Sequence, residues 1–315
     1  MSAAAWITQG LAVAVALVAA PLFLGWVNQC RAWLQNRRAP GLLQPYRGIR
    51  KLFHKEAVIA AGASPLFRLA PYVVFGAMVL AAAVIPSLGT HLPATRAADA
   101  IALVGLLATA RVFQSLAAMD VGTAFGTLGA RREMMVGFLA EPALLMVVFV
   151  ASLISASSAL PVITAELATR APALLPSLAF TAVAFTLVLL AENARIPVDN
   201  PATHLELTMI HEAMLLEYSA RHLALMEWAA ALKLLNYACI GFALFVPWGV
   251  SVGGGPLALV LSVPVLGGKL ALAGAGLATV ETLSAKLRVM RAPEFLATAF
   301  LFAVLGLLVH LLLGD

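Results

Sequence analysis

The sequence predicts an all-α, polytopic membrane protein with about eight transmembrane helices and both termini outside. Composition is the first observation: 62% of the 315 residues are hydrophobic and 11% are charged, whereas a soluble domain is nearer a quarter charged. The second is the length of the apolar runs, because a transmembrane helix needs about 20 mostly apolar residues. These runs are too long and continuous for barrel strands, and backbone groups in lipid must then be paired within helices.

Eight windows of the sequence meet this length, and we expect them to form one transmembrane domain over residues 1–315. The windows are residues 5–28, 69–88, 98–118, 134–158, 174–190, 228–250, 256–280 and 292–313. We expect the first window to be a retained span and not a signal peptide, since no basic segment or clear cleavage site accompanies it.

Basic residues in the loops predict the orientation. Fifteen Lys and Arg residues fall in four loops, against two in the opposite loops. By the positive-inside rule the four loops are cytoplasmic, and a cell (inner) membrane location is expected. The four loops are about residues 29–68, 119–133, 191–227 and 281–291. Because topology explains the net charge of +5, we expect lipid and not nucleic acid as a partner of these charges.

Cysteine content limits the chemistry of this chain. Cys30 and Cys239 are the two cysteines, too few for a metal cluster or a disulfide framework. We expect no metal site and no cofactor on this chain, so any iron–sulfur or nickel chemistry must sit on another one.

Several ionisable residues fall inside the apolar windows. Glu141, Arg111, Lys233 and Lys269 are the examples, and such residues at membrane depth are costly and usually functional. A buried carboxylate beside a cation can pass protons near neutral pH. The other interpretation is that these groups form structural pairs that hold helices together.

A dense set of ionisable residues follows the fifth apolar window. Glu192, Arg195 and Asp199 lie on its membrane side. Asn200-Pro201 has the pattern of an N-cap followed by proline, which predicts a helix running to about residue 222.

This predicted helix carries two stripes of polar residues. Glu206 and Glu217, three turns apart, share one face. His204, His211 and Tyr218 recur every seven residues and form the second stripe. Proton relay and docking of a redox partner suit this set, whereas the alternative is a solvated, amphipathic loop helix.

Two other cytoplasmic segments carry patterns of their own. Arg37 and Arg38 begin a basic loop, and residues 46–56 form an amphipathic, basic stretch that should lie at the membrane surface. This stretch either anchors the chain on anionic lipid or docks a peripheral subunit. The spacing of Gly122, Gly126 and Gly129 allows two helices to approach closely, and the neighbouring carboxylates Asp120 and Glu133 mark a candidate entrance of a proton path.

The motifs resemble a known family. Residues 192–199, Glu-Asn-Ala-Arg-Ile-Pro-Val-Asp, and residues 217–219, Glu-Tyr-Ser, are similar to the membrane protein that forms the foot of the quinone chamber in NADH–quinone oxidoreductase, complex I. Residues 200–214, Asn-Pro-Ala-Thr-His-Leu-Glu-Leu-Thr-Met-Ile-His-Glu-Ala-Met, look more like the hydrogenase branch, hydrogenase-4 component C and formate hydrogenlyase subunit 4. The likeness covers essentially the whole chain.

The resemblance implies the membrane anchor of a group 4 membrane-bound [NiFe]-hydrogenase-like complex. Large and small hydrogenase-type subunits and an iron–sulfur protein would sit on its cytoplasmic face, with their [NiFe] and iron–sulfur centres, and antiporter-like subunits would extend beside it. Carried onto this chain, the resemblance implies a proton pathway of Glu141, Glu192, Glu206 and Glu217. It also implies a docking or chamber floor of Arg37, Arg38, Arg195, Asp199, His204, His211 and Tyr218.

The sequence leaves alternatives to this assignment. In the complex I relatives the floor holds quinone, but the first loop here lacks their Gly-Pro-Asn-Arg-Val-Gly-Pro pattern. A quinone-binding subunit of a complex I-like complex, a stand-alone ion transporter and a passive anchor with structural carboxylates are the alternatives.

Overall fold

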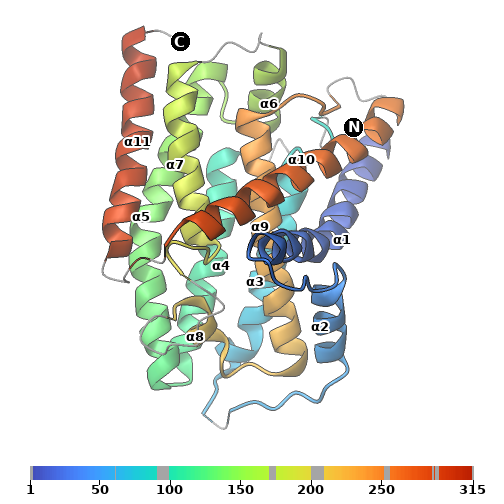
Figure 1. The fold of residues 1–315 in the computed structure, drawn as a ribbon, viewed down its shortest axis with the longest axis vertical. Helices are drawn as coiled ribbons and strands as arrows, with labels where there is room; N and C mark the ends of the chain where they lie inside the picture. The colour runs from blue at the N-terminus through green and yellow to red at the C-terminus, as the bar shows by residue number, and fades with distance from the viewer. Residues whose placement is uncertain are drawn as a thin grey trace.

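The computed structural model describes residues 3–60, 62–90, 99–169, 175–199, 209–251, 256–285, 287 and 291–313, and these residues form a helical bundle (Figure 1). Within them the only β structure is one isolated bridge, between Gly89 and Ser251. The helices are α1 (Ala3–Leu34), α2 (Gln44–Phe53), α3 (Pro65–Val84), α4 (Ala100–Asp120), α5 (Ala124–Ser155), α6 (Leu160–Thr169), α7 (Pro176–Glu192), α8 (His211–Leu215), α9 (Ala220–Phe245), α10 (Pro256–Leu283) and α11 (Ala292–Leu313). The predicted all-α class is confirmed.

The number of membrane-spanning helices agrees with the sequence prediction. Among the described residues, seven helices are long and apolar enough to cross a membrane, and α7, which has 17 residues, lies at the remaining predicted span. Both termini lie toward the same end of the molecule (Figure 1), as an even number of crossings requires. The chain is therefore a multi-pass membrane protein.

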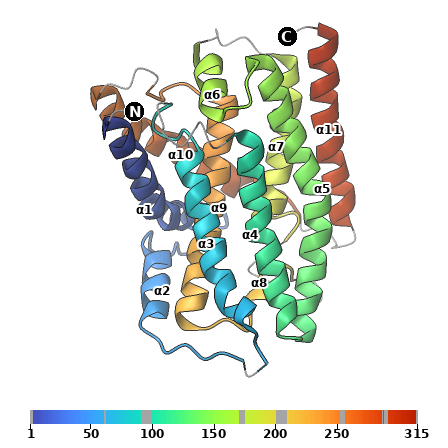
Figure 2. The same ribbon diagram turned by 180° about the vertical axis from the view of Figure 1, so that it is seen from behind.

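The bundle has one central helix and several peripheral ones. In its most apolar window α9 is 67% buried, whereas α10 is 17% and α11 22% buried. α3 and α1 pack on α9, α4 joins α3 to α5, and α11 lies against α7 and α5 (Figure 2). α7 ends near the middle of the molecule, while α5 continues to its lower end (Figure 1), so the end of α7 delivers its polar residues into the interior.

Two of the predicted loops are shorter than expected, because the helices continue beyond their apolar windows. α1 extends to Leu34, and α5 begins at Ala124 rather than near residue 134. Thr123 caps α5 by accepting a hydrogen bond from the Gly126 amide, at 3.4 Å. Most of the predicted loop over residues 119–133 is therefore helix, and Glu133 lies on α5.

The predicted helix over residues 200–222 is wrong in its described part. The segment contains the short α8, and α9 begins separately at Ala220. Between them the Ser219 hydroxyl bonds both the carbonyl and the amide of Val58, and Ala220 has a positive φ of 45°. Contacts with the 58–67 segment thus override local helix propensity. The first part of the predicted helix, with Glu206 and His204, lies outside the described residues.

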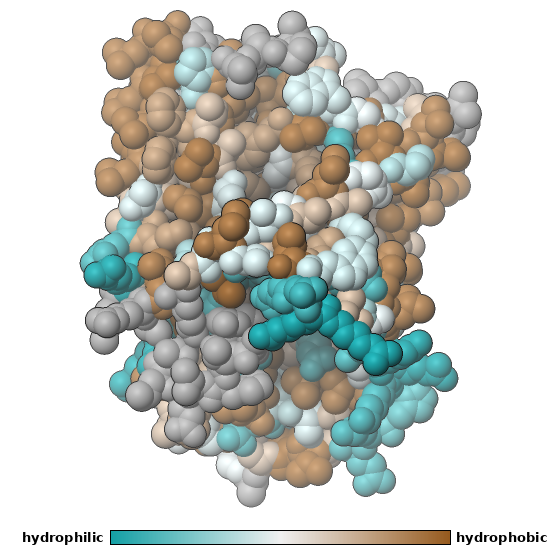
Figure 3. All heavy atoms as spheres, in the orientation of Figure 1, coloured by the Kyte–Doolittle hydropathy of each residue, from teal (hydrophilic) through white to brown (hydrophobic). Residues whose placement is uncertain are grey.

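The amphipathic stretch predicted over residues 46–56 is helical as far as Phe53, within α2, and its expected place at the membrane surface stays a prediction. Its basic side chains Arg47 and Arg50 are exposed, while Ile49 is buried. α2 packs against α9, with the Phe53 ring edge-on to Trp228. Figure 3 shows apolar side chains over the upper part of one face and hydrophilic ones gathering lower down, below α10.

The predicted close approach at the glycines is confirmed at two of them. A side chain at Gly126 would lie 2.6 Å from the Ala118 carbonyl oxygen. One at Gly129 would lie 2.8 Å from the Ile210 carbonyl oxygen. Gly129 therefore lets α8 lie directly on α5, and this contact places His211 beside the interior of the bundle.

Candidate functional site

Arg111 is the centre of a buried charge cluster that joins three helices. It lies in the middle of α4 and is 6% exposed. Its guanidinium contacts Glu133 at 3.5 Å and Glu141 at 2.7 Å, both on α5, and Glu192 at the end of α7. One cation thus holds three carboxylates at membrane depth.

The spacing of residues on α5 explains how one arginine reaches two of its carboxylates. Glu133, Gly137 and Glu141 recur every four residues, so they share one face of the helix. A side chain at Gly137 would overlap the Arg111 guanidinium. The glycine therefore leaves the space in which Arg111 lies. This Glu-x3-Gly-x3-Glu stripe opposite a mid-span arginine is the signal by which the sequence could have predicted the cluster.

Glu192 has a second cationic partner. The Lys233 ammonium, from the central helix α9, lies 2.9 Å from its other carboxylate oxygen. Glu192 is 1% exposed, and burial of an ion is tolerated where charges of the opposite sign surround it. Among the described residues, the cluster then contains three carboxylates and two cations, so one negative charge is left over when all of these are ionised.

His211 connects this cluster to the loop after α7. Its Nε2 atom lies 3.4 Å from Glu133 Oε2, and its Nδ1 atom lies 3.9 Å from Asp199 Oδ2. Asp199 is held in place because its Oδ2 accepts the amides of Ile210 and His211, at 3.3 and 3.4 Å. Asp199, His211, Glu133, Arg111 and Glu192 form a continuous chain of ionisable groups.

A second buried cluster lies on the other side of the same loop. Arg195 contacts Glu281 of α10 at 3.1 Å, and Arg31 of α1 contacts the other oxygen of Glu281 at 3.5 Å. Burial lowers the pKa of the Arg195 guanidinium, and Glu281 opposes that shift. Residues 192–195, which form a Glu-x-x-Arg motif, therefore contribute to both clusters, since Glu192 contacts Arg111 and Arg195 contacts Glu281 of α10.

The predicted docking residues fall in different places. Arg195, Asp199 and His211 lie together around the loop after α7, as described above. Arg37 and Arg38 are exposed at the end of α1 and line a polar pocket of about 310 Å³. They are therefore separate from the other three.

The Glu217-Tyr218-Ser219 motif packs against the segment that enters α3. Tyr218 stacks on Phe67, with ring centroids 4.1 Å apart, and its hydroxyl donates to the Phe67 carbonyl at 3.2 Å. Burial, with Asp120 nearby, raises the pKa of Tyr218, so the hydroxyl stays a donor. Within the described residues Glu217 has no ion pair with the Arg111 cluster. Tyr218 thus holds the segment before α9 against α3.

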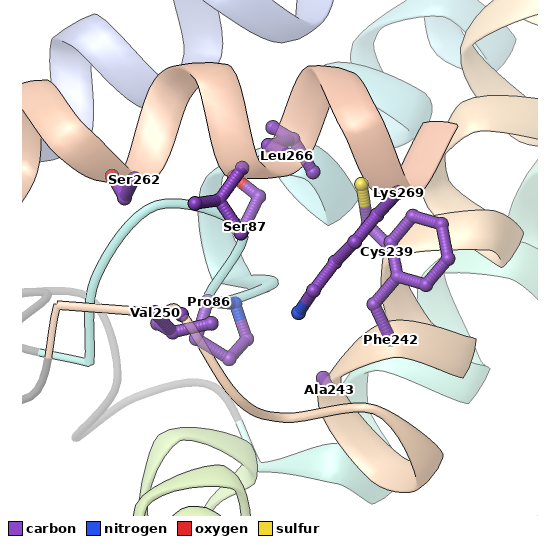
Figure 4. A pocket seen from close by; sticks show the side chains of 11 residues that line it. Pro86, Ser87, Cys239, Phe242, Ala243, Val250, Ser262, Leu266 and Lys269 are labelled. Carbon is purple, nitrogen blue, oxygen red and sulfur yellow. The ribbon is translucent and has the colours of Figure 1, made fainter. Parts of the chain in front are cut away.

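Lys269 is separate from both clusters. Its ammonium donates to the Val246 carbonyl at 2.6 Å, just beyond the end of α9, where a cation is favourable. Figure 4 shows it lying beside Cys239 and Phe242, in a pocket that also contains Pro86 and Ser262. Of the three cations predicted inside spans, two pair with carboxylates and Lys269 caps a helix.

The sequence reasoning missed two members of the second cluster as site residues. Glu281 lies just beyond the seventh apolar window, and Arg31 just beyond the first. Charged residues at the ends of apolar windows are easily assigned to loops when helix ends are uncertain. Their pairing depends on the crossing of α1 and α10, which spacing along the chain does not show.

Comparisons with known proteins agree with this architecture. The family model described as NADH dehydrogenase matches residues 7–312. Formate hydrogenlyase subunit 4 of Escherichia coli is 34% identical over 301 residues, 93% of this chain and 94% of that protein. Hydrogenase-4 component C of Escherichia coli is 37% identical over 237 residues, 75% of this chain and 73% of that protein.

A solved structure shows the same fold. A chain of the membrane-bound sulfane sulfur reductase, an archaeal respiratory membrane complex, superposes with a TM-score of 0.83 at 20% identity. The match covers 96% of this chain and 98% of that chain. The family model over residues 7–312 and these two relatives show that the chain belongs to the NADH dehydrogenase family.

Proposed function

We propose that this chain is the membrane anchor and proton-pathway subunit of a group 4 [NiFe]-hydrogenase-like complex in the inner membrane. The relatives support the assignment, since one is a component of a hydrogenase and another a subunit of formate hydrogenlyase. The single observation that carries the proton pathway is the buried cluster around Arg111, with its excess carboxylate.

Charge balance gives the cluster a capacity for one proton. Burying a net charge in a low-dielectric interior is costly, and one proton on a carboxylate or on His211 neutralises the excess. The proton moves between sites as an O–H or N–H bond breaks and another forms, with no electron transfer on this chain. A redox change in a docked subunit would bias where that proton resides.

The cluster has two ends that suit a pathway. Asp199 and His211 lie close together beyond the end of α7, and by the positive-inside rule this end would face the cytoplasm. Glu141 is 35% exposed at the opposite side of Arg111. A partly exposed carboxylate at membrane depth suits transfer to a neighbouring, antiporter-like membrane subunit.

The partners and cofactors follow from the same proposal. The large and small hydrogenase-type subunits and the iron–sulfur protein would bind the cytoplasmic face and carry the [NiFe] and iron–sulfur centres. Within the described residues no group of three or more His, Cys, Asp or Glu could hold a metal ion. In this proposal the chain supplies charge and protons, and the docked subunits carry the electrons.

A quinone site is the second candidate, because an apolar cavity of about 310 Å³ opens beside α1. It lies between α1 and α10, lined by Phe23, Trp26 and Leu270 among others. None of its lining residues comes from the loop with Asp199, where a quinone head would have to meet the polar residues of the chamber floor.

The composition of the complex is tested by purification through a tag on this chain in mild detergent, with mass spectrometry and metal analysis. The proposal expects a hydrogenase-like large subunit, nickel and iron. Iron without nickel would indicate a relative with different redox chemistry. A chain that purifies alone and moves ions in liposomes would be a stand-alone transporter and would contradict the proposal.

The proton pathway is tested by substituting His211, which lies between Asp199 of the loop after α7 and Glu133 of the Arg111 cluster. His211→Gln keeps a polar side chain but removes the titrating ring, so ion movement by the reconstituted complex should fall severalfold while electron transfer to a viologen dye persists. His54→Gln is the matched control, because His54 is exposed and its ring contacts the Arg50 carbonyl of its own helix end. Equal ion movement in both variants would remove His211 from the pathway.

A further inference from the structure

Two hollows lie next to each other at the cytoplasmic end of α1. The first is the apolar cavity between α1 and α10, and the second is the polar pocket at the end of α1, each of about 310 Å³. Leu42 lines the apolar cavity, and its neighbours Pro40 and Gly41 line the polar pocket. The segment from Pro40 to Leu42 is thus the common wall of an apolar and a polar compartment.

A glycine on α1 brings this wall into place. A side chain at Gly25 would overlap the Leu42 carbonyl, so the loop crosses directly over the helix. Gly25 lines the polar pocket, while Phe23 and Trp26 line the apolar cavity. The two compartments are therefore within about one helical turn, roughly 5 Å, of each other along α1.

The polar pocket has the charge of an anion site. Its lining contains Arg31, Arg37 and Arg38 and no carboxylate. Arg31 shares Glu281 with Arg195, so that cluster has an excess positive charge. Within the described part of the chain, Arg37 and Arg38 have no carboxylate partner. Asn28, Gln35 and Gln44 add amides that can donate hydrogen bonds.

The apolar cavity suits an acyl chain, because its lining is apolar and it lies between two peripheral helices. Its walls are formed by Leu22, Phe23, Leu266 and Leu270 among others, on two helices that face the outside of the bundle. Trp26 donates to the Ala271 carbonyl at 2.9 Å and packs edge-on against Trp33. Tryptophan at this level is typical of the membrane interface. Figure 3 shows the matching boundary, with apolar surface at α10 and hydrophilic surface below it.

We propose that these compartments form one site for an anionic phospholipid, with its phosphate in the arginine pocket and an acyl chain in the groove between α1 and α10. The arginines favour a phosphate over the neutral head of a quinone, since guanidinium–phosphate hydrogen bonds are charge-assisted. The apolar groove favours a lipid over free phosphate. The bound lipid would fix α10, the helix that holds Glu281 under Arg195.

The test uses two variants that act on different ends of the lipid. Arg37→Gln with Arg38→Gln weakens the headgroup pocket. Gly267→Phe fills the groove. Gly267 lines the groove, and a Cβ atom added there would have no other atom of this chain within 4 Å. The matched controls are Arg47→Gln with Arg50→Gln, exposed on α2, and Gly268→Phe, which also meets open space but does not line the groove.

The complex is purified through this chain, washed with detergent, and analysed by native mass spectrometry after titration with phosphatidylglycerol, phosphatidylcholine or inorganic phosphate. We expect one phosphatidylglycerol more on the parent complex and the controls than on either variant. In the arginine variant the affinity should fall by at least about tenfold, since loss of a single charge-assisted hydrogen bond would give that much. Equal retention of phosphatidylglycerol in variants and controls would overturn the proposal.

Three other outcomes would also overturn it. Phosphatidylcholine retained as well as phosphatidylglycerol would mean that the arginines do not select an anion. Phosphate binding lost in the arginine variant but unchanged by Gly267→Phe, with no lipid retained, would indicate a free anion site. Quinone retained in place of lipid and lost in both variants would indicate a quinone site.

Discussion

The two buried clusters on either side of the loop after α7 have opposite charge excess. Around Arg111, three carboxylates face two cations. Around Glu281, two arginines face one carboxylate within the part of the chain that the structure describes. The first cluster can accept a proton and connects through His211 to a fourth carboxylate, Asp199. The second cluster connects α1, α10 and the loop after α7, and its described carboxylate is shared by both arginines. This arrangement is typical of a cluster that stabilises the fold.

The comparison shows why one short motif has two roles. Glu192 and Arg195 are three residues apart, but the helix ends between them, and Ala194 has a positive φ of 51°. The chain therefore turns, and the two side chains enter different clusters. Removing the Glu192 carboxylate on one side of this turn should therefore affect ion movement, whereas removing the Glu281 carboxylate on the other side should affect stability.

The largest expected effect on stability is at the centre of the first cluster. Arg111→Met leaves the buried Glu133 and Glu192 and the partly exposed Glu141 with only Lys233, and breaking a buried pair costs about 3–5 kcal/mol. We expect failed assembly or a large drop in the unfolding midpoint of the purified complex. Arg31→Met is the comparison, because Arg31 is 22% exposed and Glu281 keeps Arg195, so its cost should be about 1 kcal/mol or less. Equal losses would contradict the different roles.

A smaller effect is expected at the glycine that makes room for Arg111. Gly137→Ala forces the guanidinium to move and should cost about 1–3 kcal/mol, as overpacking does. Gly105→Ala on α4 is the control, because a side chain there meets nothing within 4 Å. It should be neutral or stabilising by about 0.5–1 kcal/mol. Denaturant unfolding of both variants checks this. An unchanged free energy of unfolding in Gly137→Ala would mean that the Arg111 side chain can move at little cost.

The smallest effect is expected at the contact that fixes the loop before α9. Tyr218→Phe removes the hydrogen bond to the Phe67 carbonyl but keeps the ring stack. The loss should be about 0.5–1.5 kcal/mol, measured as a shift of the unfolding midpoint, with ion movement unchanged. Loss of ion movement at full stability would instead place Tyr218 in the proton pathway.

The sequence predicted most of the fold because its strongest signals are long apolar runs. It predicted less of the site, because contacts between helices decide it. Glu141 and Glu192 were expected, and they share Arg111. Glu133 was expected at an entrance, yet it lies within the cluster, since α5 starts well before its apolar window. Glu206 and His204 lie outside the described residues, so their roles stay predictions.

Glu281 shows most clearly which contacts a sequence pattern does not predict. It lies 86 residues along the chain from Arg195, on a strongly tilted helix (Figure 1). No spacing rule connects residues across such a crossing. The helix break before Ala220 has a similar cause, since the contacts of Ser219 with Val58 are made 161 residues apart.

The most direct test of the proton pathway compares Glu192→Gln with Glu281→Gln in the reconstituted complex, measuring ion movement per electron transferred. Each variant replaces one buried carboxylate by an amide of the same shape. We predict that Glu192→Gln assembles and transfers electrons but loses coupled ion movement, whereas Glu281→Gln keeps the coupling ratio and loses stability. Normal ion movement in an assembled Glu192→Gln complex would contradict a proton pathway through Glu192.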